Sequence, residues 1–489
     1  MNVRESLVRN TVWYGLVTGV GLLSGLIMSV LLARGLGPTR MGEYSYILWA
    51  ARTMTALAMM GFAVATVRYT AAAIAQGDRA LAWGFVHLLK RRQIIATLIV
   101  IAVGLPLLMV FAPANLRWPL VIMCIALFPA TVEYIYSNSV YGAQRYDLTA
   151  QASTIKMIVQ LTLSVIVLAL GFGIIGLVTA NLITSTVSCT LQRRRSQSVY
   201  PKTPAPVPPD VLPELRRFLV PLSVVTVLDA LVWDRSPVFF LQLWGSPHDI
   251  AYYSLAFGLA ATAMIIPQIT VGGLLPAFSA LHGSGAVDEF RRVYRTALRY
   301  VLLAGAPIAA TSIATAPTLI TFLYGDVYLP VARLFSVLIA VAMIAVMRSV
   351  AWAALRGLGD RKWAVIATGV SAVVSIATAV LLVGRFGTWG AVAANGAAQL
   401  VATTWVLVVM AKTYRCGFPA LDATKIVLAA MIALVAGLAI TGPGIPRLVL
   451  TGLVVPATYL GACLLSGVVG QREWQFLLTS TRRFATRPA

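Results

Sequence analysis

The stretch QIIATLIVIAVGLPLLMVFA at residues 93–112 contains 20 residues and no charged side chain. A helix rises 1.5 Å per residue, so about 20 apolar residues cross the ~30 Å hydrocarbon core of a bilayer. Lys90, Arg91 and Arg92 come directly before this stretch, as basic residues do on the cytoplasmic side of a span. The stretch therefore predicts a transmembrane helix.

The composition extends this prediction to the whole chain. Of its 489 residues, 59% are hydrophobic and 11% are charged, whereas a soluble domain carries about 25% charged residues. An ordinary water-soluble enzyme and any disordered or fibrous protein are thereby excluded. We expect an all-α polytopic membrane protein with fourteen transmembrane helices. The predicted spans are 11–33, 44–68, 93–112, 118–141, 148–171, 174–191, 218–244, 250–276, 299–324, 331–355, 363–384, 388–411, 426–442 and 447–469.

The Lys and Arg residues are distributed unevenly between the predicted loops. With the N-terminus placed inside, 27 of them lie in inside segments and 5 in outside loops. Because cytoplasmic loops carry the excess of basic residues, both termini are predicted to be cytoplasmic. The net charge of +22 then reflects loops held against anionic membrane lipids, and we do not expect nucleic acid as a partner.

A Pro-rich segment, residues 192–217, follows the sixth predicted span and favours extended, semi-rigid chain. It separates a predicted N-lobe, 1–191 with spans 1–6, from a predicted C-lobe, 218–414 with spans 7–12. Residues 415–489 hold the last two spans and a cytoplasmic amphipathic tail. In that tail, and also at 287–299, apolar residues share one helical face. This pattern is typical of a helix on the inner leaflet, and a packing role is equally compatible with it.

The two predicted lobes carry a weak internal repeat. Phe172-Gly173 matches Phe386-Gly387 at an offset of 214 residues, and Gly142 matches Gly357 at an offset of 215. Six predicted spans separate the members of each pair. An even number of spans restores the direction through the membrane, so the pattern predicts parallel repeats related by an axis along the membrane normal.

Several short motifs follow one another along the chain. They are Ala33-Arg34-Gly35-Leu36-Gly37-Pro38, Gly42-Glu43-Tyr44-Ser45, Asp234-Arg235, Tyr252-Tyr253-Ser254 and Leu355-Arg356-Gly357-Leu358-Gly359-Asp360. With these motifs, its paired lobes and its trailing helix pair, the chain resembles the Wzx-type oligosaccharide-lipid flippases of the multidrug/oligosaccharidyl-lipid/polysaccharide (MOP) exporter superfamily. It departs from the pattern at Ala251, where the repeat places the partner of Gly42.

The resemblance implies a MATE-like fold with two six-helix lobes in a V around a central cavity, a transporter rather than an enzyme, and no cofactor. It implies that a polyprenyl-pyrophosphate-linked oligosaccharide is moved from the cytoplasmic to the periplasmic leaflet by alternating access. The product would be a surface polysaccharide, such as O-antigen, capsule or exopolysaccharide. Polysaccharide polymerase and glycosyltransferase machinery are then the expected partners.

Basic residues inside predicted spans are the candidate binding groups for the diphosphate. An ionisable group in the hydrocarbon costs several kcal/mol unless it faces a partner or a wet cavity, and guanidinium groups pair bidentately with phosphate oxygens. Lipid II flippases of the superfamily similarly line their cavity with arginines, one of them in the second helix, which supports Arg52. The candidates are Arg52, Arg348, Lys156 and Arg235. For Arg235 an ion pair with Asp234 is the alternative, and Arg348 can instead extend toward the inner boundary.

Three acidic residues also fall inside predicted spans. Asp229 lies near the middle of the seventh span, where a carboxylate can exchange a proton during transport. Glu133, which shares a helical face with Tyr136 and Ser137, is a candidate for a sugar or ion contact, and Asp234 is a further candidate for ion coupling. A fixed ion pair with one of the arginines is the alternative.

Two other classes of function remain open. A cation-coupled multidrug exporter of the same superfamily usually has twelve helices and an acid-rich lobe, whereas this chain has more predicted spans and more basic residues in them. A membrane-embedded polysaccharide assembly enzyme needs a large catalytic loop, which the predicted topology lacks; a scaffold would leave the intramembrane charges without use. With four Cys and three His, and no CxxC motif, the sequence predicts no metal site.

Overall fold

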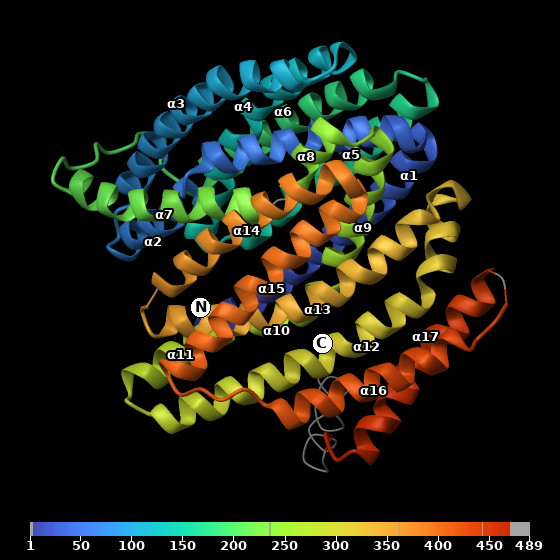
Figure 1. Cartoon of the computed structure of the whole chain (residues 1–489). Coiled ribbons are helices and arrows are strands. Elements are labelled where there is room, and N and C mark those ends of the chain that lie inside the picture. Colours follow the sequence, from blue (N-terminus) through green and yellow to red (C-terminus); the bar gives the residue numbers. More distant parts are fainter. Residues whose placement is uncertain (1–2, 234–235, 361, 443, 470–489) are drawn as a thin grey trace. The chain divides into compact units, whose positions relative to one another are not determined.

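Every element in the described part of the chain is a helix (Figure 1). The computed structural model describes residues 3–233, 236–360, 362–442 and 444–469. Its helices are α1 (Val3–Met59), α2 (Phe62–Ala75), α3 (Arg79–Phe111), α4 (Ala114–Gly142), α5 (Tyr146–Ala169), α6 (Gly173–Val199), α7 (Val211–Trp233), α8 (Pro237–Trp244), α9 (Pro247–Ala263), α10 (Ile265–Val271), α11 (Leu274–Gly283), α12 (Val287–Tyr324), the 3-10 helix η1 (Asp326–Tyr328), α13 (Pro330–Gly357), α14 (Lys362–Phe386), α15 (Thr388–Lys412), α16 (Ala420–Leu438) and α17 (Gly444–Leu465). The predicted amphipathic tail at the C-terminus lies outside the described residues.

Twelve segments among the described residues are long and apolar enough to cross a membrane. One of them, Thr18–Met59, covers 42 residues and contains a kink at Gly37, where the backbone φ is 70°. The exact number of fourteen spans therefore stays a prediction, while the predicted all-α polytopic fold is confirmed. The predicted joints at Phe172-Gly173 and Phe386-Gly387 are also confirmed, because helices end and begin there.

The second predicted span, 44–68, is wrong as a single continuous helix. The chain breaks between α1 and α2 at Met60 and Gly61, whose φ angles are 39° and 75°. Gly61 adopts this left-handed conformation without a steric penalty. The break also places Leu222 of α7 against Gly61, where only 2.7 Å separates its Cγ from the position that a Cβ on Gly61 would take.

Of the two roles left open for residues 287–299, the structure supports packing within the protein and not a separate helix on the inner leaflet. They form the first turns of α12, which continues without a break to Tyr324. Phe290 and Tyr294 on the apolar face of this segment are buried, and Phe278 of α11 lies 4.8 Å from Phe290, ring centroid to centroid. The apolar face therefore packs against α11.

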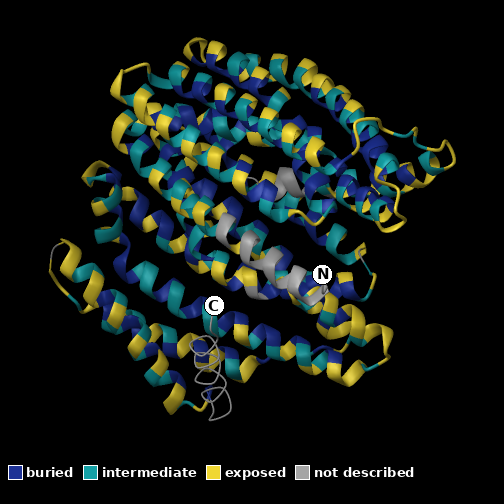
Figure 2. Ribbon diagram, turned by 180° about the vertical axis from the view of Figure 1, so that it is seen from behind, coloured by how far each residue is buried: buried dark blue, intermediate teal, exposed yellow. Residues whose placement is uncertain are grey.

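The chain divides into two units, Met1–Ser254 with Val383–Ala391 and Leu255–Leu382 with Val392–Ala489. In the first unit, a core of buried side chains from α2, α3, α4 and α7 includes Phe62, Trp83, Ile135 and Leu215. In the second, α12 packs against α13, α16 and α17. Figure 2 shows that the helices also carry exposed faces, and large apolar side chains such as Leu453 lie on them. Such faces fit a hydrocarbon surround. The predicted lobe boundaries stay a prediction.

Most of the Pro-rich segment lies between α6 and α7, and it is fixed to α3. The Ala205 N–H donates to the Ala80 carbonyl over 2.9 Å, and the ring of Tyr200 stacks on Trp83 at 5.2 Å. The carbonyl oxygen of Ala205 also lies 2.1 Å from the position that a Cβ on Gly84 would take. Glycine at position 84 therefore permits this close backbone approach.

Candidate functional site

Two of the predicted site residues, Lys156 on α5 and Glu133 on α4, form an ion pair. The Lys156 ammonium donates to both oxygens of the Glu133 carboxylate, over 2.8 Å and 3.1 Å. The Glu133 side chain is 10% exposed and that of Lys156 is 36% exposed. Since a buried carboxylate needs a compensating charge, this geometry favours an ion pair for Glu133, with a lysine as its partner in place of the predicted arginine.

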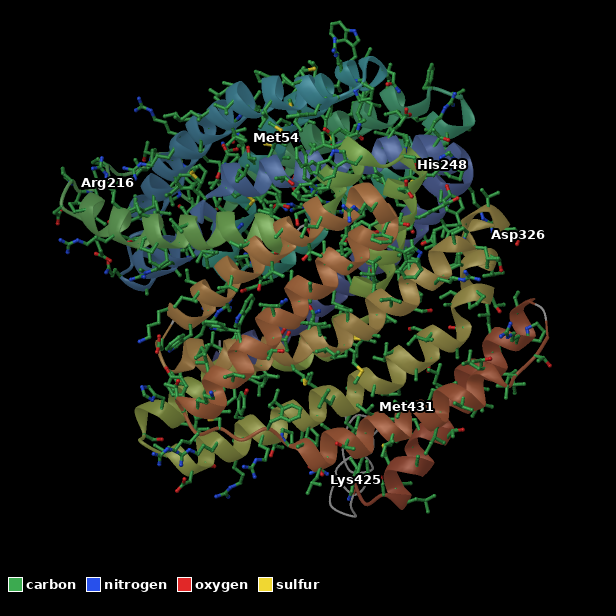
Figure 3. All side chains as sticks on the ribbon, in the orientation of Figure 1. Met54, Arg216, His248, Asp326, Lys425 and Met431 are labelled. Atoms are coloured by element: carbon green, nitrogen blue, oxygen red, sulfur yellow. The ribbon has the colours of Figure 1, made fainter. Side chains whose placement is uncertain are left out.

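Arg52 lies on α1, and its side chain is exposed. Met54, two residues later on the opposite side of the helix, is buried with Cys124 and Leu127 of α4 (Figure 3). Because residues two apart on a helix point about 200° apart, Arg52 faces away from that cluster. Among the described residues, Arg52 makes no ion pair. Its charge is therefore not compensated by a described carboxylate.

Aromatic rings lie on the same side of α1 as Arg52, one turn earlier. The Trp49 ring lies 6.0 Å from that of Phe239 on α8, and Phe239 contacts Phe240 at 5.5 Å, which in turn stacks on Trp244 at 5.6 Å. These rings were not predicted from the sequence, although three of them follow the charged pair Asp234-Arg235 closely in the predicted span 218–244. Aromatic faces beside a cation suit a ligand with both apolar and anionic parts.

In the second unit, Arg348 on α13 is held by two neutral groups. Its guanidinium donates to the Gln399 side-chain oxygen on α15 over 2.6 Å and lies 4.8 Å from the ring centroid of Trp352, one turn further along α13. Trp352 was visible in the sequence at helical spacing, but Gln399 is 51 residues away and was not. These contacts fix the position of Arg348 and leave its charge in place.

The remaining predicted site residues cannot be placed. Asp234 and Arg235 lie outside the described residues, and Asp229 is on α7 with its side chain outside the described part. The predicted pairing of Arg235 with Asp234 and the predicted coupling role of Asp229 stay predictions. Within the described residues, no group of three or more His, Cys, Asp or Glu side chains is arranged to hold a metal ion.

The motif Gly42-Glu43-Tyr44-Ser45 has a packing function in the structure. A Cβ on Gly42 would lie 1.7 Å from the carbonyl oxygen of Pro247, at the start of α9. The neighbouring Thr39 hydroxyl and His248 Nε2 form a hydrogen bond of 3.2 Å, and Figure 3 labels His248 at this end of α9. Glycine at position 42 is thus required by a backbone contact with the 247–248 turn.

The repeat prediction is supported by two turns with the same geometry. After Gly142 at the end of α4, Gln144 has a φ of 57°, and after Gly357 at the end of α13, Gly359 has a φ of 75°. In both turns the next residue donates its N–H to the carbonyl five positions earlier, over 3.1 Å in each case. This hydrogen bond closes a Schellman motif. The two glycines that match in sequence at an offset of 215 residues therefore precede turns of the same geometry, one in each unit.

Residues 31–333 match the family described as polysaccharide biosynthesis protein. No curated protein matches the chain.

Solved structures of membrane transport proteins share the fold of this chain. The lipid II flippase MurJ in an inward closed conformation is 14% identical, with a TM-score of 0.72, covering 93% of this chain and 98% of that one. An inward-facing multidrug resistance MATE family transporter of the MOP superfamily is 16% identical, with a TM-score of 0.69, covering 80% and 95%. A MOP superfamily transporter from Pyrococcus furiosus is 16% identical, with a TM-score of 0.58, covering 83% and 95%. The predicted MOP/MATE-like fold is confirmed.

Proposed function

The chain belongs to the polysaccharide biosynthesis protein family, and from this membership we propose that it translocates a polyprenyl-pyrophosphate-linked oligosaccharide. Transport runs from the cytoplasmic to the periplasmic leaflet of a bacterial inner membrane by alternating access. The fold supports a transporter, because it is shared with a lipid II flippase over 93% of the chain. The glycan would then pass to polysaccharide polymerase or glycosyltransferase machinery. No catalytic step is needed for this function.

The observation that carries the proposal is the guanidinium of Arg52, which is exposed and forms no ion pair with a carboxylate of the described residues. Arg52 lies about 22 Å along the helix from the kink at Gly37 and about 12 Å before the break at Met60. A charge at such a depth is costly unless it serves a ligand or a wet cavity. A diphosphate is the matching ligand, since a guanidinium binds phosphate oxygens through two parallel hydrogen bonds. Membership of a polysaccharide biosynthesis family supports a glycan as the cargo, and a polyprenyl-pyrophosphate-linked glycan would carry such a diphosphate.

Arg348 is proposed as a second contact for the diphosphate during transport. Its contacts with Gln399 and Trp352 hold the guanidinium in a fixed position on α13. Lys156 is the weakest candidate, because Glu133 already neutralises its ammonium. For Asp229 we propose proton coupling, so the Asp229→Asn variant should lose the pH dependence of export while its membrane yield stays that of the wild type.

Substitution of Arg52 tests the proposal in cells that depend on this protein for surface polysaccharide. We expect Arg52→Ala to reduce export at least 100-fold without loss of folded protein, because removal of an exposed cation leaves no buried charge unpaired. Arg52→Lys should retain partial export, since the ammonium keeps the charge but lacks the planar fork. The measurements are surface polysaccharide, membrane yield and thermal stability.

Arg68→Ala is the matched control for Arg52→Ala. Arg68 is exposed and contacts Glu214 at 3.8 Å on the surface, so its loss should leave export within twofold of the wild type. Full export by Arg52→Ala would refute the diphosphate-binding role, and so would a loss of export that follows the amount of folded protein. Export of cationic drugs but not of glycan would favour the multidrug exporter alternative.

A further inference from the structure

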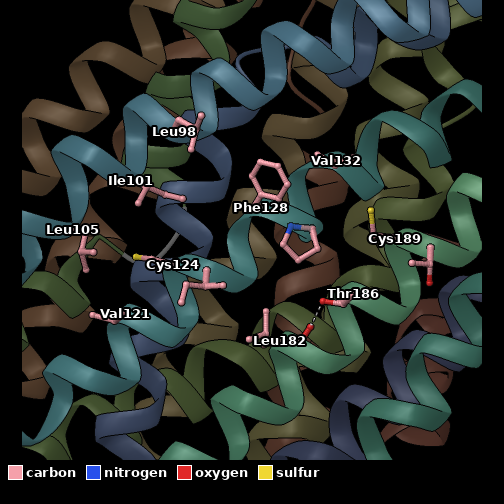
Figure 4. A pocket seen from close by; sticks show the side chains of 13 residues that line it. Leu98, Ile101, Leu105, Val121, Cys124, Phe128, Val132, Leu182, Thr186 and Cys189 are labelled. Carbon is pink, nitrogen blue, oxygen red and sulfur yellow. Dashed lines mark hydrogen bonds between the residues drawn. The ribbon is translucent and has the colours of Figure 1, made fainter.

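An open groove with apolar walls lies between α3, α4 and α6. Its volume is about 570 Å³, within the size range of pockets that hold drug-sized molecules. Figure 4 shows Leu98 and Ile101 on one wall, Phe128 on a second, and Leu182 with Thr186 on a third. The Thr186 hydroxyl already donates to the Leu182 carbonyl over 2.8 Å, so the groove presents hydrocarbon and little hydrogen-bonding capacity.

The groove is open to the surroundings of the protein. Leu98 is 53% exposed, Phe128 is 40% exposed and Ile125, also in the lining, is 54% exposed. No part of the described chain covers these side chains. In a membrane span, an uncovered apolar groove is filled by lipid hydrocarbon, because water has no partners there.

Two of the groove walls continue along their helices to a basic residue. On α6, Leu182, Thr186 and Cys189 line the groove at helical spacing, and Arg193 follows one turn later on the same face. On α3, Lys90 lies two turns before Leu98, again at the spacing of one face. Since α3 runs antiparallel to α4 and α6 in chain order, both basic residues lie at the same end of the groove, the end predicted to be cytoplasmic.

The basic residue of α6 lies close to the groove lining, because Arg193 follows Cys189 by one helical turn. The Lys90 ammonium also lies 5.9 Å from the Tyr136 ring centroid on α4. Glu133 and Lys156 cancel each other through their ion pair, so Lys90 and Arg193 leave a net charge of about +2 beside the groove.

We propose that this groove is a binding site for an anionic phospholipid of the cytoplasmic leaflet. Lys90 and Arg193 bind the phosphate, and an acyl chain lies in the groove between α3, α4 and α6. The face of α6 from Leu182 in the groove to Arg193 beyond its end extends about 16 Å, which matches the ~15 Å depth of one leaflet. Basic pockets between membrane helices on the cytoplasmic side bind anionic head groups in this way.

The assignment is independent of the proposed transport function. A polyprenyl carrier is much longer than one leaflet, whereas the groove accommodates a chain of leaflet length with its phosphate at the boundary. A bound phospholipid would fill the space between the three helices and support the N-terminal unit in the membrane.

Native mass spectrometry of the purified full-length protein tests the site. The protein is delipidated in detergent and titrated with phosphatidylglycerol, phosphatidylcholine or a polyprenyl diphosphate. We expect phosphatidylglycerol to bind the wild type in preference to phosphatidylcholine. The double variant Lys90→Gln/Arg193→Gln should bind phosphatidylglycerol about thirty-fold more weakly.

The control Arg92→Gln/Arg195→Gln makes the same change of charge at neighbouring positions off the groove face and should bind as the wild type does. A second variant, Thr186→Trp, fills the groove without changing its charge and should also lose the lipid. Its control is Ile183→Trp, on the exposed side of α6 outside the groove lining.

Three results would overturn the proposal. Equal weakening in the Arg92→Gln/Arg195→Gln control would reduce the effect to surface charge. Unchanged phosphatidylglycerol binding in both Lys90→Gln/Arg193→Gln and Thr186→Trp would show that the lipid does not bind in the groove. Tighter, groove-dependent binding of the polyprenyl diphosphate than of phosphatidylglycerol would assign the site to the transport substrate instead.

Discussion

At the scale of single residues, loss of Lys156 and loss of Glu133 from their ion pair should cost the protein different amounts of stability. Glu133 is the more buried partner, so Lys156→Met strands a carboxylate in a poorly solvated place and should destabilise the protein by about 3 kcal/mol. Glu133→Gln leaves the more exposed ammonium, which can reach solvent, and should cost less than half as much. The measurement is thermal unfolding of the purified variants in detergent.

The double variant Lys156→Met/Glu133→Gln provides the control for this prediction. It removes both charges and should recover most of the stability that Lys156→Met loses, as a coupled pair requires. Equal costs for the two single variants, or costs that simply add in the double variant, would contradict the ion pair as a structural unit.

The sequence predicts which residues carry charge at membrane depth but not which of them find a partner. Arg52 and Lys156 looked alike, as isolated cations in apolar runs. The structure separates them, because the partner of Lys156 is 23 residues away on a different helix and Arg52 has no described carboxylate. Such pairings depend on helix rotation and on which helices pack together, and neither is encoded in hydropathy. Gln399, the partner of Arg348, was missed for the same reason.

At the scale of elements, the contact between α3 and the Pro-rich segment depends on Gly84. A methyl group at this position would collide with the Ala205 carbonyl, so Gly84→Ala should release the segment and increase tryptic cleavage at the exposed Lys202 several-fold. Gly104→Ala on the same helix is the control, because its added methyl group meets only the flexible end of Met54 at 3.0 Å. Limited proteolysis in membranes measures both variants.

Unchanged cleavage of Gly84→Ala would show that the hydrogen bond from Ala205 to Ala80 and the stacking of Tyr200 on Trp83 hold the segment without the close approach at Gly84. Equal acceleration in Gly84→Ala and Gly104→Ala would attribute cleavage to general loosening of α3.

Hydrophobic runs predict the existence of helices well and their limits poorly. The joints at residues 172–173 and 386–387 were predicted correctly, because a positive-φ glycine ends each apolar run. The break at Met60–Gly61 was missed, since Met, Gly and Phe there are all apolar and hydropathy does not register a backbone turn. The start of α12 was missed because the amphipathic pattern of 287–299 is typical of a helix on the membrane surface. In the structure its apolar face packs on α11.

At the scale of the whole molecule, the bias of basic residues predicts the orientation in the membrane. Reporter fusions after Pro209 and after Arg487 should both report a cytoplasmic location, and a fusion after Ser246 should report the periplasm. Since α8 ends just before Ser246, the last fusion lies at a helix boundary and should not interrupt a span. A periplasmic signal after Pro209 would contradict the predicted topology of fourteen spans.

The whole-chain architecture was predictable because it repeats local signals. Helical spans, the spacing of the repeat and the motif glycines all recur along the sequence, and Gly142 and Gly357 end in equivalent turns. The substrate was not predictable in the same way, since one guanidinium at position 52 can bind any phosphorylated lipid. Sugar specificity would depend on side chains such as Trp49 and Phe239, whose grouping arises only on folding.

Lipid translocation by the purified protein tests the central claim most directly. The protein is reconstituted into liposomes with a fluorescent polyprenyl-pyrophosphate-linked oligosaccharide, and a membrane-impermeant quencher reports the fraction that reaches the opposite leaflet. The wild type should translocate the labelled lipid, Arg68→Ala should do so at a similar rate, and Arg52→Ala should fall to the rate of protein-free liposomes. Translocation at the protein-free rate by the folded wild type, or wild-type rates from Arg52→Ala, would contradict the account.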